Sequence, residues 1–431
     1  MQGGHVAARM PAVPDLRVSA NRAAFPRLAP VWYTESMRTT AVPTGQPAAS
    51  AVLGRPLRDR VRAWQERRLF HSLRPWRGPR LVQIGITDRC NYRCLMCPDH
   101  SPLVADLPAE GQRAQMSLPV LQGLLDDLIL LGGTRWIDLV GIGEPLLHPD
   151  FMEWAGEVKR AGFGLCMSSN GSLLDEGKAR RLADMGLDRI NVSINAGSDE
   201  VYREVHPGSP PAVRQRILVS LKALMGRCDE MGRPHPALAL SAVVFESTYR
   251  DLLGVVRSAA EVGAEYVHFH PMATVPGTKA LALSPAESQQ AREIMGEVGQ
   301  LAKELGVGTN ASTFVTDERP DLGRDAYRQI RCYAGHVFSR ILADGQVRFC
   351  CGCDWTAGNL NERPFRRIWR SGAYARMRRL ALGLPSSANA PAYCSCFTAC
   401  PHHAHNIAIH NVLFPQRRFP TSIAPDPRIL G

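Results

Sequence analysis

The chain has 431 residues, 45% of them hydrophobic, so it can bury a sizeable core and form two or three domains. No apolar run approaches the ~18 to 20 residues of a membrane span, and no basic segment followed by an apolar one indicates a secretory signal. Residues 1–80 hold 14 Arg and no Lys against four acids and so carry nearly all of the net charge of +11. The charge of the rest of the chain does not indicate a nucleic-acid binder.

The first 55 residues are rich in Pro, Ala, Arg and Ser/Thr, and we expect a disordered basic leader. An organelle transit peptide is a second interpretation, and an over-long start with Met37 as the true first residue is a third. Residues 56–79 are expected to form a linker, because Leu57, Val61 and Trp64 share a helical spacing. This helix would pack against the body of the protein or contribute to substrate recognition.

From Leu81 onward, short strand patterns alternate with helical patterns, which is typical of a parallel sheet or barrel. We predict strands at 82–87, 136–141, 164–168, 189–194, 238–244 and 266–270. We predict helices at 118–131, 151–161, 176–185, 212–226, 249–262 and 285–305. The fold class is therefore α/β, with a partial (β/α)6 barrel over residues 80–310. In barrels of this kind the active site lies at the carboxyl ends of the strands.

Three cysteines follow the first predicted strand at C-x3-C-x2-C spacing: Cys90, Cys94 and Cys97. Thiolates suit iron–sulfur clusters, and three of them can hold three irons of a 4Fe–4S cluster and leave the fourth iron open. A structural zinc knuckle would want a fourth ligand close by and usually comes as paired C-x2-C. Inert buried cysteines would have no reason to keep this spacing.

This loop resembles the signature of the radical S-adenosylmethionine (radical SAM) enzymes. In that family SAM chelates the open iron, and the 5′-deoxyadenosyl radical formed from SAM removes a hydrogen atom from the substrate. Later strand ends add to the resemblance. Gly141-Ile142-Gly143-Glu144-Pro145 resembles the family's Gly-Gly-Glu-Pro, with Ile142 as a departure; Ser169-Asn170-Gly171 is similar to Thr-Asn-Gly, and Ser193-Ile194-Asn195 to Ser-x-Asp.

The resemblance implies a set of SAM-binding residues on these loops. Gly143 and Glu144 would hold the amino end of SAM, and Ser193 its ribose or carboxylate. His206 stands where relatives have the Arg that binds the carboxylate, so either His206 or Arg203 would take that role. Met96 would face the adenine unless it is a core residue. The full set is Met96, Gly143, Glu144, Ser169, Asn170, Ser193, Arg203 and His206.

A second cysteine group begins at Cys332 and continues with Cys350, Cys351 and Cys353 after a hairpin pattern around Asp344-Gly345. An Arg-rich helix is predicted over 365–382, and Cys394, Cys396 and Cys400 follow it. This arrangement resembles the SPASM/twitch extension of radical SAM enzymes, which implies at least one auxiliary 4Fe–4S cluster. We therefore expect a C-terminal cysteine-rich hairpin-plus-helix domain over 311–410, followed by a tail over 411–431.

The implied auxiliary ligands are Cys332, Cys350, Cys396 and Cys400, with Cys394 as a further candidate. Their assignment is open, because the family ends in C-x2-C where this chain reads C-x-C-x3-C. One cluster, two clusters and a four-cysteine zinc site are the alternatives. Cys351 and Cys353 are catalytic candidates, since a free thiol beside the barrel could return a hydrogen atom to a substrate radical.

Several histidines have two interpretations each. His268 and His270 alternate with apolar residues of one strand and should face the same side, either toward substrate or into the core. His402, His403, His405 and His410 are expected to be surface or structural residues, with a metal site as the weaker alternative.

Three functions follow from these patterns. The first is a radical SAM oxidoreductase that performs oxidation, dehydrogenation or bond formation on a natural-product small molecule or a ribosomal peptide. The second is a redox-neutral radical SAM epimerase. The third is a non-enzymatic iron–sulfur or zinc protein whose basic leader binds nucleic acid. The first two would need an electron donor such as flavodoxin or ferredoxin. The clustered cysteines favour a reducing, cytoplasmic location without membrane contact.

Overall fold

One ten-stranded sheet organises the molecule. The computed structural model describes residues 68–315, 329–384, 400, 402–414 and 416–418. The strand order is β10-β9-β8-β1-β2-β3-β4-β5-β6-β7, and neighbouring strands from β1 to β7 are parallel. The strands of the predicted barrel are β1 (Leu81–Gly85), β2 (Trp136–Val140), β3 (Gly164–Ser169), β4 (Arg189–Ser193), β5 (Ala237–Val244) and β6 (Tyr266–Pro271), with the short β7 (Gly308–Thr309) added at the edge. The predicted leader over 1–55 lies outside the described residues.

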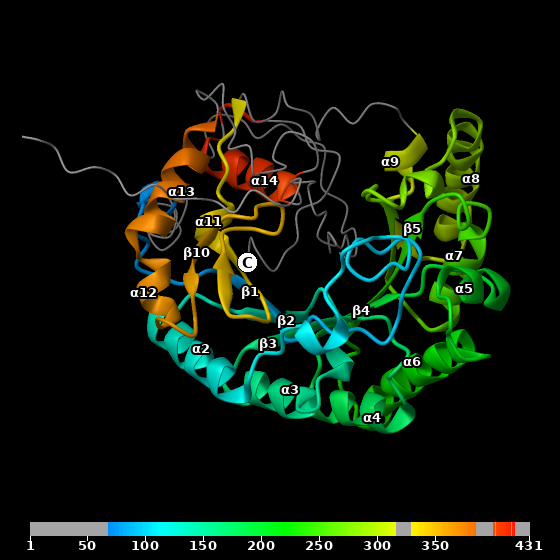
Figure 1. The fold of residues 1–431 in the computed structure, drawn as a ribbon, viewed down its shortest axis with the longest axis horizontal. Coiled ribbons are helices and arrows are strands. Elements are labelled where there is room, and N and C mark those ends of the chain that lie inside the picture. The colour runs from blue at the N-terminus through cyan, green and yellow to red at the C-terminus, as the bar shows by residue number, and fades with distance from the viewer. Residues whose placement is uncertain (1–67, 316–328, 385–399, 401, 415, 419–431) are drawn as a thin grey trace, which may run out of the picture.

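The main helices cover the outside of this sheet. The sheet forms the inner side of an open arc, and the helices lie around it (Figure 1). The predicted partial barrel is thereby confirmed. Its helices are α2 (Leu118–Leu131), α3 (Phe151–Arg160), α4 (Glu176–Met185), α6 (Val213–Glu230), α7 (Leu252–Glu261) and α8 (Pro285–Glu304). A further short helix, α5 (Asp199–Val205), was not predicted; Ser198 caps it by accepting a hydrogen bond from the backbone N–H of Val201.

The two faces of the sheet differ in chemistry. One face packs on the helices and is almost fully apolar; its residues, all at most 1% exposed, are Val82, Ile84, Ile137, Leu139, Leu165, Met167, Ile190, Val192, Leu238, Leu240, Val267 and Phe269. Successive side chains of a strand point to opposite faces, so the residues between them line the inside of the arc. That inner face carries polar groups, among them Gln83, Asp138, Asn191, Ser241 and His268. The barrel is therefore built to present polar groups to its interior.

The predicted hairpin is present and joins the barrel. Strands β8 (Phe338–Ile341) and β9 (Gln346–Arg348) are antiparallel, and Gly345 takes the positive φ of 85° that their turn requires. Strand β8 also pairs in parallel with β1, which the sequence did not indicate. Strand β10 (Thr356–Asn359) completes this edge. The barrel and the cysteine-rich region consequently share one continuous sheet.

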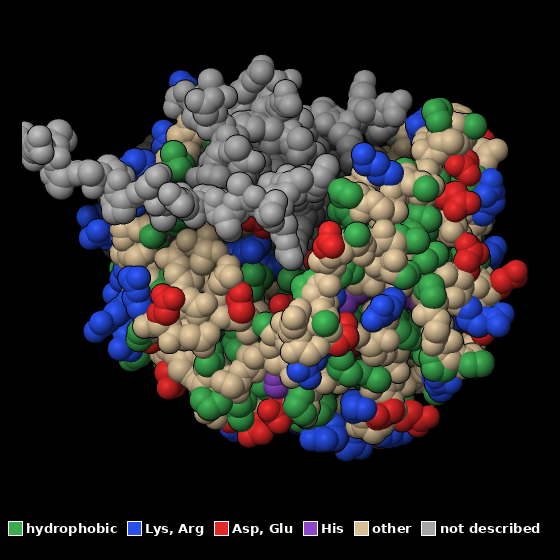
Figure 2. All heavy atoms as spheres, in the orientation of Figure 1, with side chains coloured by type: hydrophobic (Ala, Val, Ile, Leu, Met, Phe, Trp, Pro, Cys, Tyr) green, Lys and Arg blue, Asp and Glu red, His purple; other side chains and the backbone are tan. Residues whose placement is uncertain are grey.

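The helix predicted over 365–382 is two helices, α12 (Phe365–Trp369) and α13 (Gly372–Leu382). Ser371 separates them, because its Oγ accepts a hydrogen bond from the backbone N–H of Tyr374 and so begins a new helix. The remaining helices of this region are α9 (Ser312–Val315), α11 (Ala334–Val337) and α14 (His403–Leu413). Lys and Arg side chains gather over α12 and α13 on the face drawn in Figure 2; the exposed ones are Arg366, Arg367, Arg370, Arg376 and Arg379.

A buried arginine fastens this region to the start of the described chain. Arg378 is fully buried and donates hydrogen bonds to the carbonyl oxygens of Gly335, Leu73 and Trp369 at 2.8, 3.0 and 2.8 Å. Its guanidinium also lies over the rings of Trp369 and Tyr374, at 4.1 and 4.2 Å from their centroids. In the described part of the chain, no helix combines the length and hydropathy needed to span a bilayer.

Candidate active site

The three cysteines begin at Cys90, three residues after Thr87 and beyond the end of β1. Cys90, Cys94 and Cys97 are partly buried, and the backbone N–H of Cys97 donates to the carbonyl of Cys94 at 3.0 Å. Burial and the proximity of Cys97 and Cys90 raise the pKa of Cys94. Three thiolates crowded into so little water would repel one another, so this loop favours a positively charged partner such as the irons of a cluster.

The second strand end packs directly on the cysteine loop. The N–H of Glu144 donates to the carbonyl of Arg89 at 2.8 Å, and that of Gly143 to the carbonyl of Thr87 at 3.3 Å. A Cβ atom on Gly143 would lie 1.9 Å from the Arg89 carbonyl oxygen. Glycine is therefore the residue that permits this close approach of two backbones.

Glu144 joins three strand ends. It is 2% exposed, and its Oε1 accepts hydrogen bonds from the Ser169 hydroxyl and the Leu146 N–H at 2.7 and 3.0 Å. Its Oε2 accepts from the N–H of Asn170 at 2.6 Å. Burial raises the pKa of Glu144, while the three donors oppose that rise. A cationic amino group brought to this carboxylate would stabilise its charged form and so lower the pKa of Glu144.

A second link ties the third strand end to the cysteine loop. Asn170 Nδ2 donates to Asn91 Oδ1 at 3.0 Å, and Asn91 Nδ2 donates to the Ser172 hydroxyl at 2.8 Å. Asn91 lies between Cys90 and Cys94 and was not among the predicted site residues. The structure thus brings Gly143, Glu144, Ser169 and Asn170 together around the cysteine loop.

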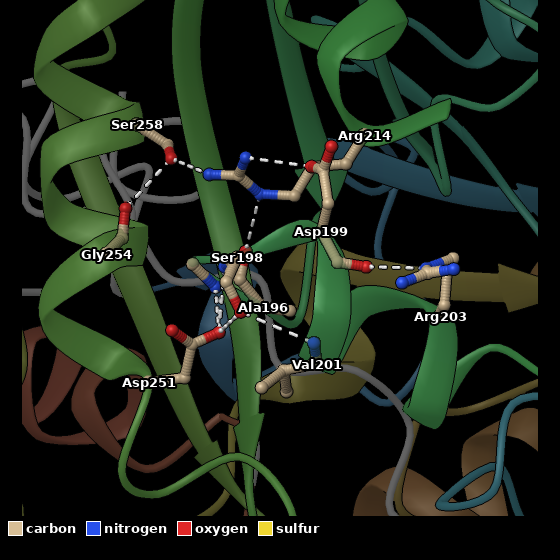
Figure 3. Close-up of polar contacts among 10 residues, drawn as sticks. Ala196, Ser198, Asp199, Val201, Arg203, Arg214, Asp251, Gly254 and Ser258 are labelled. Carbon is tan, nitrogen blue, oxygen red and sulfur yellow. Dashed lines mark hydrogen bonds and ion pairs between the residues drawn. The ribbon is translucent and has the colours of Figure 1, made fainter. Parts of the chain in front are cut away.

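The connection from β4 to α5 is braced from outside the barrel, as Figure 3 shows. Asp251 Oδ2 accepts from the N–H groups of Gly197 and Ser198 at 2.7 and 2.8 Å. The buried Arg214 donates from Nε to the carbonyl of Ala196 at 3.2 Å. Arg203 is exposed, and its Nε donates to the carbonyl of Asp199 on its own helix at 3.4 Å.

His206 lies in the interior at the end of α5. Its Nδ1 is 2.8 Å from the Tyr202 carbonyl, and its Nε2 is 3.2 Å from Asn195 Nδ2. Burial lowers the pKa of His206 to about 4, so the ring is neutral near pH 7. Asn195 adopts a positive φ of 58° here, two residues after Ser193, whose hydroxyl accepts from Ser241 at 3.4 Å. A neutral ring bonded to Asn195 differs from the cationic Arg that the family pattern has at this point.

Met96 is buried at 5% exposure in a small cluster with Val205 and Phe245. The N–H of Leu95 beside it donates to the carbonyl of Val205 at 3.0 Å, so the cysteine loop is also attached to the end of α5. Both interpretations of Met96, adenine contact and core residue, are compatible with this position.

The histidines of β6 share one face of the sheet. The rings of His268 and His270 stack with centroids 6.0 Å apart, and the Tyr266 ring lies 4.4 Å from that of His268. Because Val267 and Phe269 face the helices, both histidines belong to the polar inner face. His402 and His405 are 3% and 1% exposed, and His410 Nε2 is 2.9 Å from the Arg417 carbonyl, which fits structural roles on and before α14.

The second cysteine group divides into two sets. The thiols of Cys350 and Cys353 hydrogen-bond each other, and Cys332 interacts electrostatically with both. Cys332 Sγ also accepts a hydrogen bond from Asn406 Nδ2 at 3.6 Å. The N–H of His402 donates to Cys400 Sγ at 3.4 Å. Cys394 and Cys396 lie outside the described residues.

Cys351 points elsewhere, toward the inner face of the sheet. Its Sγ lies 3.4 Å from Gln83 Oε1 and 4.0 Å from His402 Nε2, and it accepts a hydrogen bond from Arg340. Burial raises the pKa of Cys351 to about 11, although the Arg340 charge opposes the rise. Cys351 is therefore a protonated thiol near neutral pH.

Comparison with protein-family models identifies both halves of the chain. The model described as the radical SAM superfamily matches residues 84–231, and the SPASM model, described as an iron–sulfur cluster-binding domain, matches residues 332–401. The chain is a radical SAM protein with a SPASM domain. The non-enzymatic alternative does not agree with this membership, which supports a radical SAM enzyme.

Relatives with curated names span most of this radical SAM protein. The "tungsten-containing aldehyde ferredoxin oxidoreductase cofactor-modifying protein" of Pyrococcus furiosus is 28% identical over 318 residues, 69% of this chain and 82% of the relative. The "AdoMet-dependent heme synthase" of Methanosarcina barkeri is 24% identical over 314 residues, 70% of this chain and 85% of the relative.

Solved structures show the same fold. Streptococcus suis SuiB bound to the precursor peptide SuiA superposes with a TM-score of 0.55 at 15% identity, over 88% of this chain and 82% of SuiB. The structure of anSMEcpe with bound AdoMet superposes with a TM-score of 0.52 at 14% identity, over 78% of this chain and 96% of that protein.

This radical SAM protein binds a 4Fe–4S cluster and SAM, and its SPASM domain binds an auxiliary 4Fe–4S cluster. The residues present fit these groups: three crowded thiols follow β1, a buried carboxylate lies beside them, and three further cysteines come together from just before and just after the hairpin. Among the described residues, no three His, Cys, Asp or Glu side chains converge on a single-ion site. A 4Fe–4S cluster takes its thiolates on separate irons, so its ligands need not converge on one point.

Some residues of the site were not predicted from the sequence. Gln83, Asp138 and Arg340 face the inside of the sheet from three neighbouring strands. A signal was present, because Gln83 and Asp138 interrupt otherwise apolar strands and would be costly to bury without a use. Arg340 carried no such signal, since the pairing of β8 with β1 was unknown.

Proposed function

We propose that this enzyme removes a hydrogen atom from a natural-product small molecule or a ribosomal peptide and then completes an oxidation, dehydrogenation or bond formation. When bound, the reduced cluster and SAM supply the 5′-deoxyadenosyl radical that takes the hydrogen atom. The observation that carries the proposal is the pairing of β8 with β1, which holds the auxiliary cysteines and the SAM-binding loop on one sheet. The substrate radical could then pass an electron over a short distance to the auxiliary cluster.

We assign the following roles to the chain's own residues. Cys90, Cys94 and Cys97 hold the SAM-binding cluster. Glu144 binds the amino group of SAM, and hydrogen bonds from Ser169 and Asn170 keep the Glu144 carboxylate in position. Ser193 and Met96 would contact the ribose and the adenine. The predicted carboxylate contact by Arg203 or His206 stays a prediction, because Arg203 is exposed and His206 is neutral.

For the auxiliary cluster we propose Cys332, Cys350 and Cys353 as ligands together with Cys400 or Cys396. The mutual hydrogen bond of Cys350 and Cys353 supports adding Cys353 to the set predicted from the sequence. Cys353 then moves from a catalytic candidate to a ligand, while Cys351 remains the catalytic candidate.

The proposed substrate class is supported by the relatives. The named proteins include a cofactor-modifying protein and a heme synthase, and SuiB holds a precursor peptide. Either a small molecule or a peptide is therefore the proposed substrate. Flavodoxin or ferredoxin would supply the electron, and the reaction would take place in the cytoplasm.

A redox-neutral epimerisation is the second candidate, and the position of Cys351 favours it. A protonated thiol on the inner face of the sheet could return a hydrogen atom to the substrate radical. Product formed in D2O would then carry deuterium, and Cys351→Ala would abolish that incorporation. An oxidation would leave the carbon without deuterium and would not depend on Cys351.

Anaerobic reconstitution tests the core of the proposal. The Cys90/Cys94/Cys97→Ala variant should lose about four irons relative to wild type and should form no 5′-deoxyadenosine from SAM and dithionite. Cys228→Ala, which changes a buried cysteine on α6, is the matched control. It should keep the wild-type iron content and form 5′-deoxyadenosine. Wild-type protein with full iron but no 5′-deoxyadenosine, even with candidate substrates, would overturn the proposal.

A further inference from the structure

Arg340 occupies the inner face of the sheet between the barrel and the hairpin. It lies on β8 directly opposite Gln83 of β1, which in turn lies opposite Asp138 of β2. Partners in register point to the same face, so these three side chains form a row inside the arc. Arg340 is 7% exposed, and Gln83 and Asp138 are 5% and 2% exposed.

No carboxylate of the described residues forms an ion pair with Arg340, although the charge of Arg340 acts on Asp88 nearby. Within the described part of the chain its guanidinium makes no ion pair, and its buried Nε has no hydrogen-bond partner. Its hydrogen bond goes to the Cys351 side chain. Arg348, its neighbour across the hairpin, shows the contrast, because it is paired with Asp354 at 2.7 Å. Burying a guanidinium without a hydrogen-bonded anion is costly, so such a group favours an anionic partner that the described residues do not supply.

Gln83 completes a binding arrangement beside this charge. Its Oε1 faces the Cys351 thiol at 3.4 Å, which leaves its amide N–H2 group as a donor. A guanidinium fork and an amide donor on adjacent strands match the two oxygens of a carboxylate. Arg340 lies on β8, and β1 and β2 separate it from the Ser169 and Asn170 contacts at the end of β3 that are proposed for SAM.

We propose that Arg340, assisted by Gln83, anchors a carboxylate group of the substrate beside the Cys351 thiol. This assignment rests on the proposed function, since it names the substrate class of the same interior. It also places the anchored end of the substrate next to the one side chain that is a candidate hydrogen-atom donor.

The neighbouring charges favour a carboxylate over a phosphate. The charge of Asp138 acts on Cys351, which adjoins Arg340, and the charge of Arg340 acts on Asp88. Two acids therefore lie near the same guanidinium. A singly charged carboxylate meets less repulsion from these acids than a doubly charged phosphate does. The peptide and small-molecule alternatives both remain, because a peptide C-terminus and a carboxylic acid offer the same group.

The test uses the reconstituted holoenzyme with saturating SAM, so that the carboxylate of SAM fills its own site. Thermal stability is measured with propionate, with its neutral isostere propionamide and with methyl phosphate, at matched ionic strength. A ligand that binds only the folded protein raises the unfolding temperature in proportion to its affinity. Propionate should stabilise wild type more than the other two probes, and titration of the shift gives its apparent Kd.

Two substitutions separate a specific anchor from general charge. Arg340→Gln should raise the apparent Kd for propionate about tenfold or more, the loss expected for a charge-assisted pair. Arg376→Gln removes the same charge from an exposed position on α13 and should leave the Kd unchanged. Equal effects of propionate on wild type and Arg340→Gln, or no effect on wild type, would overturn the anchor. A larger shift with methyl phosphate would overturn its assignment to carboxylates.

Failure of the anchor and failure of the proposed function give different results. SAM cleavage by dithionite without substrate is measured in the same preparations. Arg340→Gln should retain this uncoupled 5′-deoxyadenosine formation, because Arg340 contacts none of the residues assigned to SAM. No propionate binding by wild type, with SAM cleavage intact, refutes the anchor alone. Propionate binding without any SAM cleavage in wild type refutes the proposed function alone.

Discussion

The hydroxyl of Ser169 donates a hydrogen bond of 2.7 Å to Oε1 of Glu144, and so joins the end of β3 to the end of β2. The same carboxylate accepts the backbone N–H of Asn170 through its other oxygen. One acidic side chain therefore holds the ends of β2 and β3 beside the cysteine loop, and its carboxylate is placed to bind a cationic group.

Substitution of Glu144 tests this arrangement. Glu144→Gln removes the charge and turns an amide toward the Asn170 N–H, so the Kd for SAM should rise about tenfold to a hundredfold. Equilibrium dialysis of the reconstituted protein with labelled SAM measures it. Glu153→Gln, on the exposed side of α3, is the control and should leave the Kd as in wild type. An unchanged Kd in Glu144→Gln would remove this residue from the SAM site.

The contact of two loops at Gly143 gives a second prediction. In Gly143→Ala the new Cβ would meet the Arg89 carbonyl at 1.9 Å, so the cysteine loop must shift. We expect a loss of about 1 to 3 kcal/mol in stability and a lower iron content after reconstitution. Gly123→Ala, at an exposed helical position with open space around it, should instead stabilise the protein by about 0.5 to 1 kcal/mol. Normal iron content in Gly143→Ala would show that the loop accommodates the methyl group.

The two sets of C-terminal cysteines give a third prediction. Cys353→Ala should lower the iron content and change the electron paramagnetic resonance signal of the auxiliary cluster, because Cys353 lies with Cys350 and Cys332. Cys351→Ala should keep the wild-type iron content and the wild-type signal, since the Cys351 thiol faces Gln83. The reverse pattern, with iron lost on changing Cys351, would contradict the proposed ligand set. Iron analysis with the spectra of both variants decides between them.

The buried His336 gives a prediction about pH. Its Nε2 is 3.0 Å from the Ser72 carbonyl, and burial, with a smaller effect of the Arg378 charge, lowers the pKa of His336 to about 3. The unfolded chain therefore binds a proton below pH ~6.5 that the folded chain does not, so stability is present above that pH and falls as the pH falls toward 3. Between pH 7.5 and 5.5 this one group should lower the free energy of unfolding by about 1.3 kcal/mol.

Urea unfolding of wild type and His336→Gln at these two pH values checks the sign. The variant should lose less stability on acidification than wild type by about that amount, while His235→Gln, at an exposed position, should lose as much as wild type. Equal pH dependence in wild type and His336→Gln would show that His336 takes up its proton in the folded state.

The sequence by itself determined the parallel barrel and the cysteine loop after its first strand. Apolar rows such as Val82 and Ile84 specify buried strands, and the spacing of Cys90, Cys94 and Cys97 specifies a cluster, because both patterns are local. Local pattern also placed Gly143 and Glu144 at a strand end.

The tertiary structure alone decided which distant groups meet. The pairing of β8 with β1 joins residues more than 250 positions apart, and it sets Arg340 and the Cys351 thiol beside Gln83. No local spacing encodes such a pairing, since it depends on backbone hydrogen bonds that any residue can make. The side-chain contacts that follow, and the buried charge left among them, therefore emerge only when the chain is folded.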